Sequence, residues 1–233
     1  MSDLDNMTSQ KPSVRELYRQ RASSPRKSER TRQAILDAAL AFLWSHPFRD
    51  LTIAELMSRT GASRSAFYQY FKDLHDLMGA LLDGTRDEIL TAATPWLLGE
   101  GDPVPLLRES LSGLVKVTYQ RGPILRAVTD ATASDAWLEQ AWATFLAGFD
   151  DAVASRIEQH QAAGLIPEFP ARPVAVALNR LDASLLIESF GRRPRVNPEP
   201  VRESLTRIWI STLYGRQALA LAASECKAES QKS

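Results

Sequence analysis

The chain has 233 residues, of which 44% are hydrophobic and 24% are charged, a composition typical of globular proteins. A single cysteine, Cys226, excludes an internal disulfide framework, and three scattered histidines argue against a histidine metal site. Apolar runs stay short of the roughly 18 residues of a membrane span, and the N-terminus lacks the apolar segment of a secretory signal. The composition therefore predicts a cytoplasmic protein without a membrane partner.

The charge is distributed unevenly although the formal net charge is zero. Residues 11–32 contain eight Lys or Arg residues against two acidic ones. A basic end on an otherwise neutral chain favours a polyanionic partner at that end, and the alternative is a solvated disordered tail. We interpret residues 1–27 as a flexible basic arm and residues 224–233 as a frayed polar tail.

Helical periodicity runs through most of the chain, and no segment alternates apolar and polar residues as a half-buried strand would. The pattern predicts an all-α protein of about nine helices, with breaks at Pro95 and at Gly122-Pro123 because proline interrupts helical hydrogen bonding. The predicted helices cover residues 28–46, 52–60, 63–71, 73–93, 102–120, 124–131, 134–164, 173–190 and 198–223.

The second and third of these helices form the pattern of a helix-turn-helix. Thr52 and Glu55 have the spacing of a capping box, Gly61 can close the helix in the left-handed conformation, and Ser63 can cap the next. With Phe67 turned inward, hydrogen-bonding side chains face outward, which suits base reading in the major groove. These are Arg64, Ser65, Tyr68 and Gln69. A structural helical hairpin with a polar outer face is the alternative.

Residues 32–78 resemble the DNA-binding domain of the TetR family of bacterial transcriptional regulators. The resemblance is carried by ILDAA at 35–39, Thr52-Ile53, GAS at 61–63 and FYQYF at 67–71. It implies a repressor that binds a palindromic double-stranded DNA operator as a homodimer and is released by a small, largely apolar effector. It also implies DNA-contacting roles for Thr52, Ser63, Arg64, Ser65, Tyr68, Gln69, Tyr70 and Lys72.

Two departures from the family pattern weaken the expected grip of the fourth helix on DNA. The family often has histidine where Tyr70 stands and lysine where Leu74 stands, and a leucine cannot hold a phosphate. The basic arm before Ser28 is expected to compensate through contacts with the DNA backbone or the minor groove.

Residues after the linking helix, 73–93, are expected to form a ligand-binding and dimerisation domain over 94–223, beyond a DNA-binding domain over 28–75. Three segments, AWATF, ALNRLDASLL and IWISTLYG, loosely resemble the mycobacterial repressor subgroup that controls a prodrug-activating monooxygenase. This resemblance implies pocket positions, and the alternative is that the aromatic residues are simply core. The candidates are Trp142, Phe145, Phe149, Asn179, Asp182 and Trp209.

Asp182 stands where that subgroup has a neutral amide. A carboxylate there could prefer a cationic or hydrogen-bond-donating ligand, or could instead pair with Arg180. The last two long helices are expected to form the dimer, since two-fold symmetry matches a palindromic operator.

An enzyme is the main competing class of function. The sequence has no nucleophile elbow, no metal-binding motif and no P-loop, so we expect no catalytic residue, no metal and no cofactor. A helical adaptor that uses its helix-turn-helix to contact protein is the third interpretation.

Overall fold

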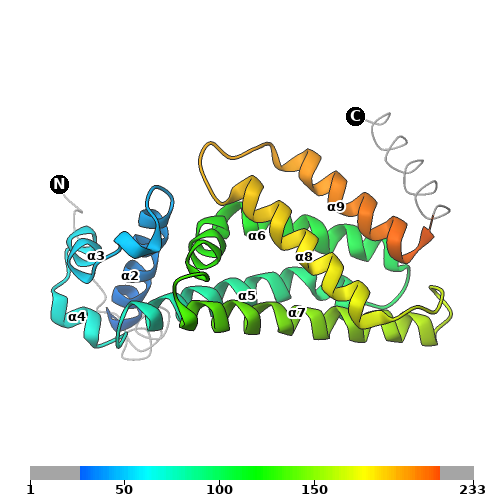
Figure 1. Cartoon of the computed structure of the whole chain (residues 1–233), viewed down its shortest axis with the longest axis horizontal. Helices are drawn as coiled ribbons and strands as arrows, with labels where there is room; N and C mark the ends of the chain where they lie inside the picture. Colours follow the sequence, from blue (N-terminus) through cyan, green and yellow to red (C-terminus); the bar gives the residue numbers. More distant parts are fainter. Residues whose placement is uncertain (1–26, 216–233) are drawn as a thin grey trace, which may run out of the picture.

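The computed structural model describes residues 27–215, and this range contains eight α-helices, one 3-10 turn and no strand, as Figure 1 shows. The all-α prediction is thereby confirmed. The predicted basic arm, up to residue 26, and everything after residue 215 lie outside the described residues. The elements are α2 (Lys27–Leu43), η1 (Phe48–Asp50), α3 (Ile53–Thr60), α4 (Arg64–Tyr68), α5 (Leu74–Leu98), α6 (Pro103–Ala131), α7 (Ala136–Ala162), α8 (Ala171–Phe190) and α9 (Pro198–Leu213).

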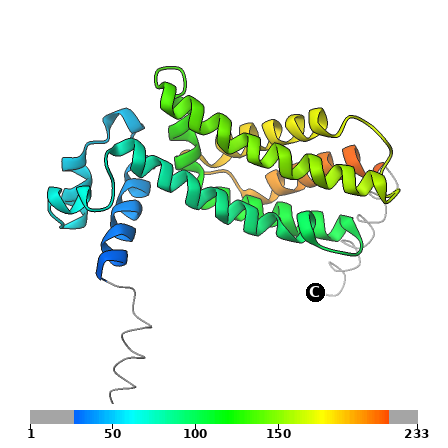
Figure 2. The ribbon, with the colours of Figure 1, turned by 90° about the horizontal axis from the view of Figure 1, so that it is seen from below.

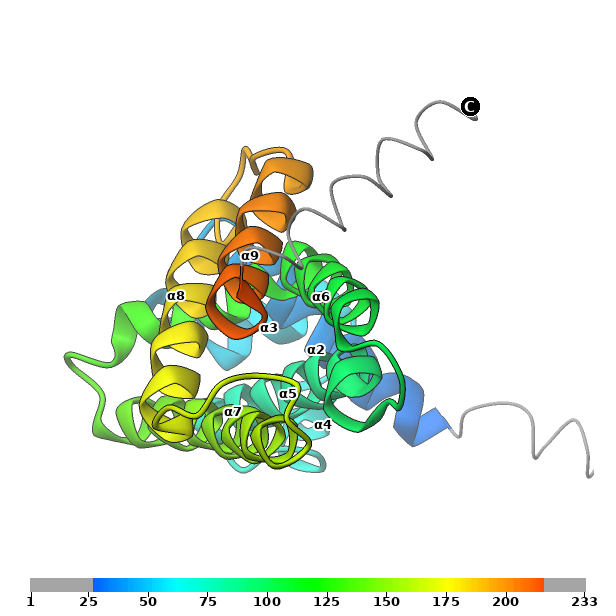
Figure 3. The ribbon, with the colours of Figure 1, turned by 90° about the vertical axis from the view of Figure 1, so that its right-hand side faces the viewer.

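The helices form a small N-terminal module, α2 to α4, and a longer helical body, α5 to α9 (Figure 1). Helix α5 leads from the module into the body, beside α7 (Figure 2). In the end view of Figure 3 the helices of the body surround a common interior. Helix α6 contacts α5, α7, α8 and α9, and also α2, so every part of the body depends on where α6 lies. No helix within residues 27–215 is long and apolar enough to cross a bilayer.

The N-terminal module is shaped by the helix caps that the sequence predicts. The Thr52 hydroxyl accepts a hydrogen bond from the backbone N–H of Glu55 at 3.1 Å, and Gly61 has a φ of 67°. Ser63 caps α4 through the backbone N–H of Ala66. The capping box is completed only on one side, because the Glu55 carboxylate pairs with Arg59 at 2.8 Å. Local side-chain chemistry therefore fixes the turn between α3 and α4.

The two predicted proline breaks are wrong, because side chains from distant segments take over the hydrogen bonds. Pro95 lies inside α5, which runs to Leu98 instead of residue 93, and the Ser110 hydroxyl of α6 accepts from the backbone N–H of Trp96 at 2.9 Å. Pro123 lies inside α6, and the carbonyl of Tyr119 that lacks its usual helical donor accepts from Arg195 at 2.5 Å. The ranges 102–120 and 124–131 are therefore one helix, so residues 27–215 contain eight α-helices where the sequence pattern predicts about nine.

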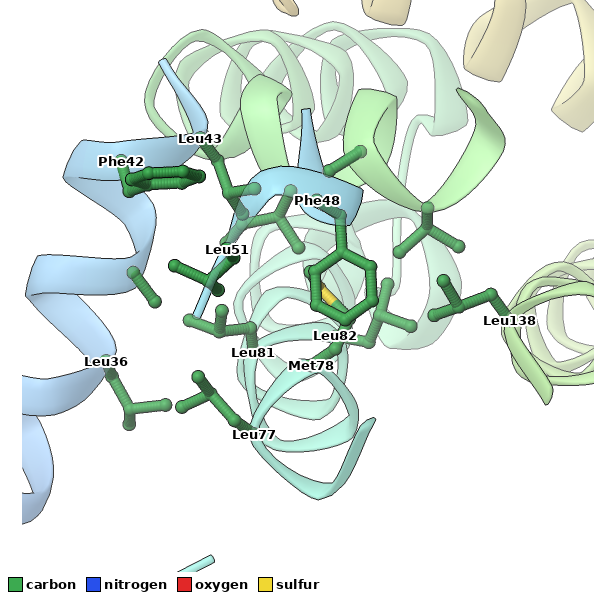
Figure 4. Packing of buried hydrophobic residues seen from close by; sticks show 14 of the residues in the cluster. Leu36, Phe42, Leu43, Phe48, Leu51, Leu77, Met78, Leu81, Leu82 and Leu138 are labelled. Carbon is green, nitrogen blue, oxygen red and sulfur yellow. The ribbon is translucent and has the colours of Figure 1, made fainter. Parts of the chain in front are cut away.

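The largest hydrophobic core does not stop at the end of the N-terminal module. Figure 4 shows Phe48 and Leu51 packed beside Leu82 of α5, with Leu138 of α7 close by. The same cluster of buried residues extends to Phe145 in the middle of α7. The module is therefore not an independent unit, since it shares its apolar interior with the body.

Two glycines in the body test how closely the helices pack. A Cβ added at Gly122 would lie 2.4 Å from the carbonyl oxygen of Phe190, whereas one added at Gly148 would meet no atom within 4 Å. We expect Gly122→Ala to force backbone against backbone and to lower the free energy of unfolding by about 1–3 kcal/mol. Gly148→Ala should raise it by about 0.5–1 kcal/mol, because alanine favours the helix over glycine. Urea unfolding measures both signs, and equal stabilities would contradict the close approach of α6 and α8.

Candidate functional site

Helix α4 presents a polar outer face, as the sequence predicts. Phe67 is fully buried and packs against Phe71, with 5.6 Å between ring centroids. This fixes the rotation of the helix and leaves four side chains exposed, with Tyr68 at 52%. The four are Arg64, Ser65, Tyr68 and Gln69.

The other predicted DNA-contacting residues lie around α4 but differ in exposure. Thr52, at the start of α3, and Lys72, after α4, are exposed. Ser63 is exposed too, and its hydroxyl oxygen lies 2.8 Å from that of Ser65 while it caps the helix. Tyr70 is only partly exposed and packs against the core, so its ring supports the module. The structure therefore brings these residues to one end of the molecule.

Free positive charge on this face comes from two residues. Within residues 27–215, neither Arg64 nor Lys72 forms an ion pair, whereas Arg59 pairs with Glu55. Arg64 begins α4 and Lys72 follows its end, so two unpaired cations flank this exposed helix and favour an anionic partner.

A second site lies inside the helical body. A cavity of about 100 Å³ lies among α5 to α9, and its wall is almost wholly apolar. All six predicted pocket residues line it: Trp142, Phe145, Phe149, Asn179, Asp182 and Trp209. The first three follow one face of α7, with successive ring centroids 5.2 Å and 5.1 Å apart.

The lining contributed by α5 and α6 is not predicted from the sequence. It comprises mainly aliphatic side chains, among them Ile89, Leu107, Leu111 and Leu114. In a sequence, an apolar residue that faces a cavity has the same helical spacing as one that faces a filled core. Thr118 also lines the cavity, and its hydroxyl donates to the backbone carbonyl of Leu114 at 2.8 Å.

Asp182 is a buried carboxylic acid in this wall, with 6% of its surface exposed. Burial raises the pKa of its carboxyl to about 7, while a hydrogen bond from Trp209 opposes the rise. That bond joins Nε1 of Trp209 to Oδ1 of Asp182 at 2.9 Å. Within the described range, Asp182 forms no ion pair. The carboxyl therefore changes its protonation state near neutral pH instead of near pH 4.

Asn179 and Arg180 are engaged elsewhere. The amide of Asn179 donates to Oδ1 of Asp150 at 2.9 Å, and Arg180 binds both oxygens of Asp150, at 3.2 and 3.0 Å. Asp150 is buried on α7. The alternative in which Asp182 pairs with Arg180 is therefore wrong, because Arg180 neutralises a different carboxylate.

A polar network closes one side of the cavity behind Trp96. Its indole N–H donates to the hydroxyl of Tyr214 at 2.8 Å, and that hydroxyl lies 2.9 Å from Nδ1 of His160. The Tyr214 oxygen accepts from Trp96, and the tautomer of the His160 ring sets which group donates in the second bond. Burial, followed by the charge of Arg156, lowers the pKa of His160, and burial raises the pKa of Tyr214 to about 12. Both shifts favour the neutral forms of the two side chains.

Arg126 links the two sites. Its side chain is buried on α6 and donates to the backbone carbonyl of Leu43, at the end of α2, at 2.6 Å. It also donates to the carbonyl of Gly191, after α8, at 2.9 Å and to Asp130 at 3.2 Å. A movement of α6 beside the cavity would therefore displace the end of α2 through the bond between Arg126 and Leu43.

The raised pKa of Asp182 makes a prediction about stability. Between about pH 4 and pH 7 the folded protein holds a proton that the unfolded chain, with a pKa near 3.8, releases. The contribution of Asp182 to the free energy of unfolding therefore falls as the pH rises through this window. The fall is about 1.4 kcal/mol for each unit by which the pKa of the folded state exceeds that of the unfolded chain. Asp182→Asn removes this loss and keeps an oxygen for Trp209 to bind.

Urea unfolding at pH 5 and pH 8 measures the effect. We expect Asp182→Asn to gain stability over the wild type at pH 8 relative to pH 5, whereas Asp37→Asn, an exposed control on α2, should show little change. A pH-independent difference for Asp182→Asn would contradict the buried titration.

Comparison with known proteins agrees with this division into two sites. Residues 35–81 match the family described as bacterial regulatory proteins, tetR family, and residues 107–215 match the C-terminal domain of the transcriptional regulator EthR. The chain is 26% identical to the HTH-type transcriptional regulator EthR of Mycobacterium tuberculosis, over 90% of this chain and 99% of that protein. It is also 26% identical to EthR of Mycolicibacterium smegmatis, over 78% of this chain and 85% of that one.

Solved structures share the fold at low sequence identity. A TetR-family transcriptional regulator from Syntrophomonas wolfei superposes with a TM-score of 0.70 at 18% identity, over 80% of this chain and 96% of that one. GusR of Salmonella enterica superposes with a TM-score of 0.68 at 17% identity, over 80% and 97%. At these identities the likeness concerns the fold alone. The two family matches together carry the assignment: the chain belongs to the TetR family of helix-turn-helix transcriptional regulators, which are not enzymes, and its C-terminal domain is of the EthR type.

Proposed function

We propose that this regulator is a ligand-responsive repressor, which binds a palindromic operator as a homodimer and is released by a small, largely apolar effector. The observation that supports the proposal best is the link, through one helix and one core, between an exposed polar recognition helix and an apolar cavity. Because operator DNA lies in the bacterial cytoplasm, we expect the protein to act in that compartment.

Operator recognition would use the exposed face around α4. Arg64, in the first turn, can address the O6 and N7 atoms of guanine with two hydrogen bonds, and Ser65 and Gln69 can reach neighbouring bases. Ser63 would assist at the same end of the helix. Phosphate contacts would come from Thr52, Tyr68, Tyr70 and Lys72, which fix the position on DNA without reading sequence.

Release would follow from a change in the shape of the body. The cavity of about 100 Å³ is smaller than the roughly 300–1,000 Å³ of drug-sized ligand sites, so an effector must displace aromatic side chains of α7 as it enters. A ligand acts only through its different affinities for two arrangements, and a 100-fold loss of operator affinity requires about 2.7 kcal/mol of coupling. Arg126 is the contact through which a displaced α6 would reorient the N-terminal module.

The dimer would use α8 and α9, which contact one another along the body. Small exposed side chains recur seven residues apart on both helices, Ala177 and Ser184 on α8 and Ser204 and Ser211 on α9. Small residues allow a close approach of helices from two subunits. A two-fold axis at this surface would place two recognition helices about one turn of DNA, ~34 Å, apart.

The recognition helix makes a prediction about DNA binding. On an operator selected from fragments of bacterial DNA, Arg64→Ala should cost about 1–3 kcal/mol while leaving binding to random DNA nearly unchanged. Tyr68→Phe should weaken binding to both DNAs about equally, because phosphate contacts carry no sequence information. Fluorescence anisotropy over a range of salt concentrations measures all four affinities.

The control is the exposed variant Ser155→Ala on α7, far along the chain from α4 and outside the proposed dimer surface. At the same protein concentration, the control variant should bind both DNAs with an affinity close to that of the wild type. Parallel losses on operator and random DNA for Arg64→Ala would contradict the assignment of α4 as the reading helix. Binding without salt dependence would favour a protein adaptor.

A further inference from the structure

Among the residues that the structure describes, one ionisable side chain lines the cavity. The lining from α5, α6, α7 and α9 includes no lysine, arginine, histidine or acid, and the one ionisable residue from α8 is Asp182. The carboxyl group accepts one hydrogen bond, from Trp209, in the part of the chain that the structure describes. A carboxylate has room for several donors, so this group retains accepting capacity toward the cavity that it lines.

Asp150, a second buried carboxylate in the body, is bonded very differently from Asp182. Asp150 is equally buried, and it is neutralised by both nitrogens of Arg180 and by the amide of Asn179. Asp182, three residues from Asn179 on the same helix, has no such cation. A buried charge without a partner is costly, and an asparagine would keep the bond to Trp209 without that cost. Within residues 27–215, no cation is therefore in place to neutralise the ionised form of this acid.

Aromatic rings surround the same space. Five line the cavity: Trp96, Trp142, Phe145, Phe149 and Trp209. Trp96 and Trp209 meet edge to face, with 5.6 Å between centroids, and Trp142 stacks on Phe145. The faces of such rings attract organic cations through their quadrupoles, most strongly when water is excluded. One carboxylate among aromatic rings is the arrangement that recognises an ammonium group.

We propose that the effector is a lipophilic organic cation, an alkyl or aralkyl amine or a quaternary ammonium compound, whose nitrogen pairs with Asp182 while its apolar part lies among the aromatic rings of α7. This rests on the proposed function, because it names the ligand class of the same cavity. A carboxylic acid effector is disfavoured, because it would place two acids in one apolar cavity.

The pH dependence of binding follows from the groups around the cavity. On α7, Asp150 is neutralised by Arg180 of α8, and burial favours the neutral forms of His160 of α7 and of Tyr214, which lie behind Trp96. The lining from α5, α6 and α9 adds no titratable side chain. A permanent cation binds the ionised form of Asp182, so its affinity should rise about tenfold between pH 6 and pH 8 and then level off.

The test uses the full-length protein and two probes of matched size, n-octylamine and 1-octanol, with calorimetry and tryptophan fluorescence at pH 8. The amine is protonated at this pH and the alcohol is neutral, so the comparison isolates the charge. Octyltrimethylammonium, whose charge does not titrate, serves for the pH series. The variants are Asp182→Asn and, as a matched control, Asp151→Asn, an exposed acid on α7 that pairs with Arg172.

We expect the wild type and Asp151→Asn to bind octylamine at least tenfold more tightly than octanol, and to be released from operator DNA by the amine. Asp182→Asn should lose this preference and the pH dependence while it still folds and binds operator. Equal affinities for the two probes in the wild type, or a preference that survives in Asp182→Asn, would overturn the assignment of the ligand class.

The experiment separates this inference from the function on which it rests. Operator release by octanol as well as by octylamine would overturn the cation proposal and leave the effector-responsive repressor standing. Failure of both probes to bind, with operator binding intact, would overturn the cation proposal alone. Failure to bind any operator would overturn the proposed function.

Discussion

The guanidinium group of Arg126 connects the end of α2, in the N-terminal module, with the end of α8, in the helical body. The last carbonyl groups of a helix lack intrahelical donors and carry partial negative charge. Arg126 donates to such a carbonyl at Leu43, which ends α2, and to another at Gly191, which follows α8. Because the group is buried, these bonds have little competition from water, and removing them would leave both carbonyls without a partner.

The loop between α8 and α9 strengthens the same junction. Arg195 lies over the ring of Tyr119 at 3.6 Å and over Trp44 of the N-terminal module at 5.0 Å, and Arg193 lies over Trp44 at 4.6 Å. Helix α5, which leads out of the module, is held at its start as well, because His75 lies 2.6 Å from Asp135, the residue before α7. The hydrophobic core continues between these polar contacts. The module thus has one defined orientation, and the body must change shape for it to move.

Local chemistry determined what could be predicted from the sequence. The caps at Thr52 and Ser63 and the turn at Gly61 depend on residues within four positions, so they are confirmed. The breaks at Pro95 and Pro123 are wrong because their compensating partners, Ser110 and Arg195, are far away in the chain. For the cavity, resemblance supplied the polar and aromatic positions, and periodicity could not separate cavity-facing aliphatic residues from the core.

The partners of Asp150 on α7 and Asp182 on α8 could not be predicted from the sequence either, because they depend on contacts between residues far apart in the chain. Asp182 and Arg180 are close in sequence but lie about 200° apart around a helix, so they cannot face one another. The arginine therefore meets Asp150 on α7, 30 residues earlier, and Asp182 faces the apolar interior. The rotation of α8 alone decides which acid receives the internal cation.

The small size of the cavity and the single acid in it act together on regulation. An entering ligand must move side chains such as Phe145, which belongs both to the cavity wall and to the core shared with the N-terminal module. That displacement costs free energy, and a purely apolar ligand offsets it only by the area it buries. A cation that pairs with Asp182 adds an interaction that exists only once the ligand is in place. The acid would thus supply part of the difference in affinity between the two arrangements, which is the only quantity that can shift the DNA-binding equilibrium.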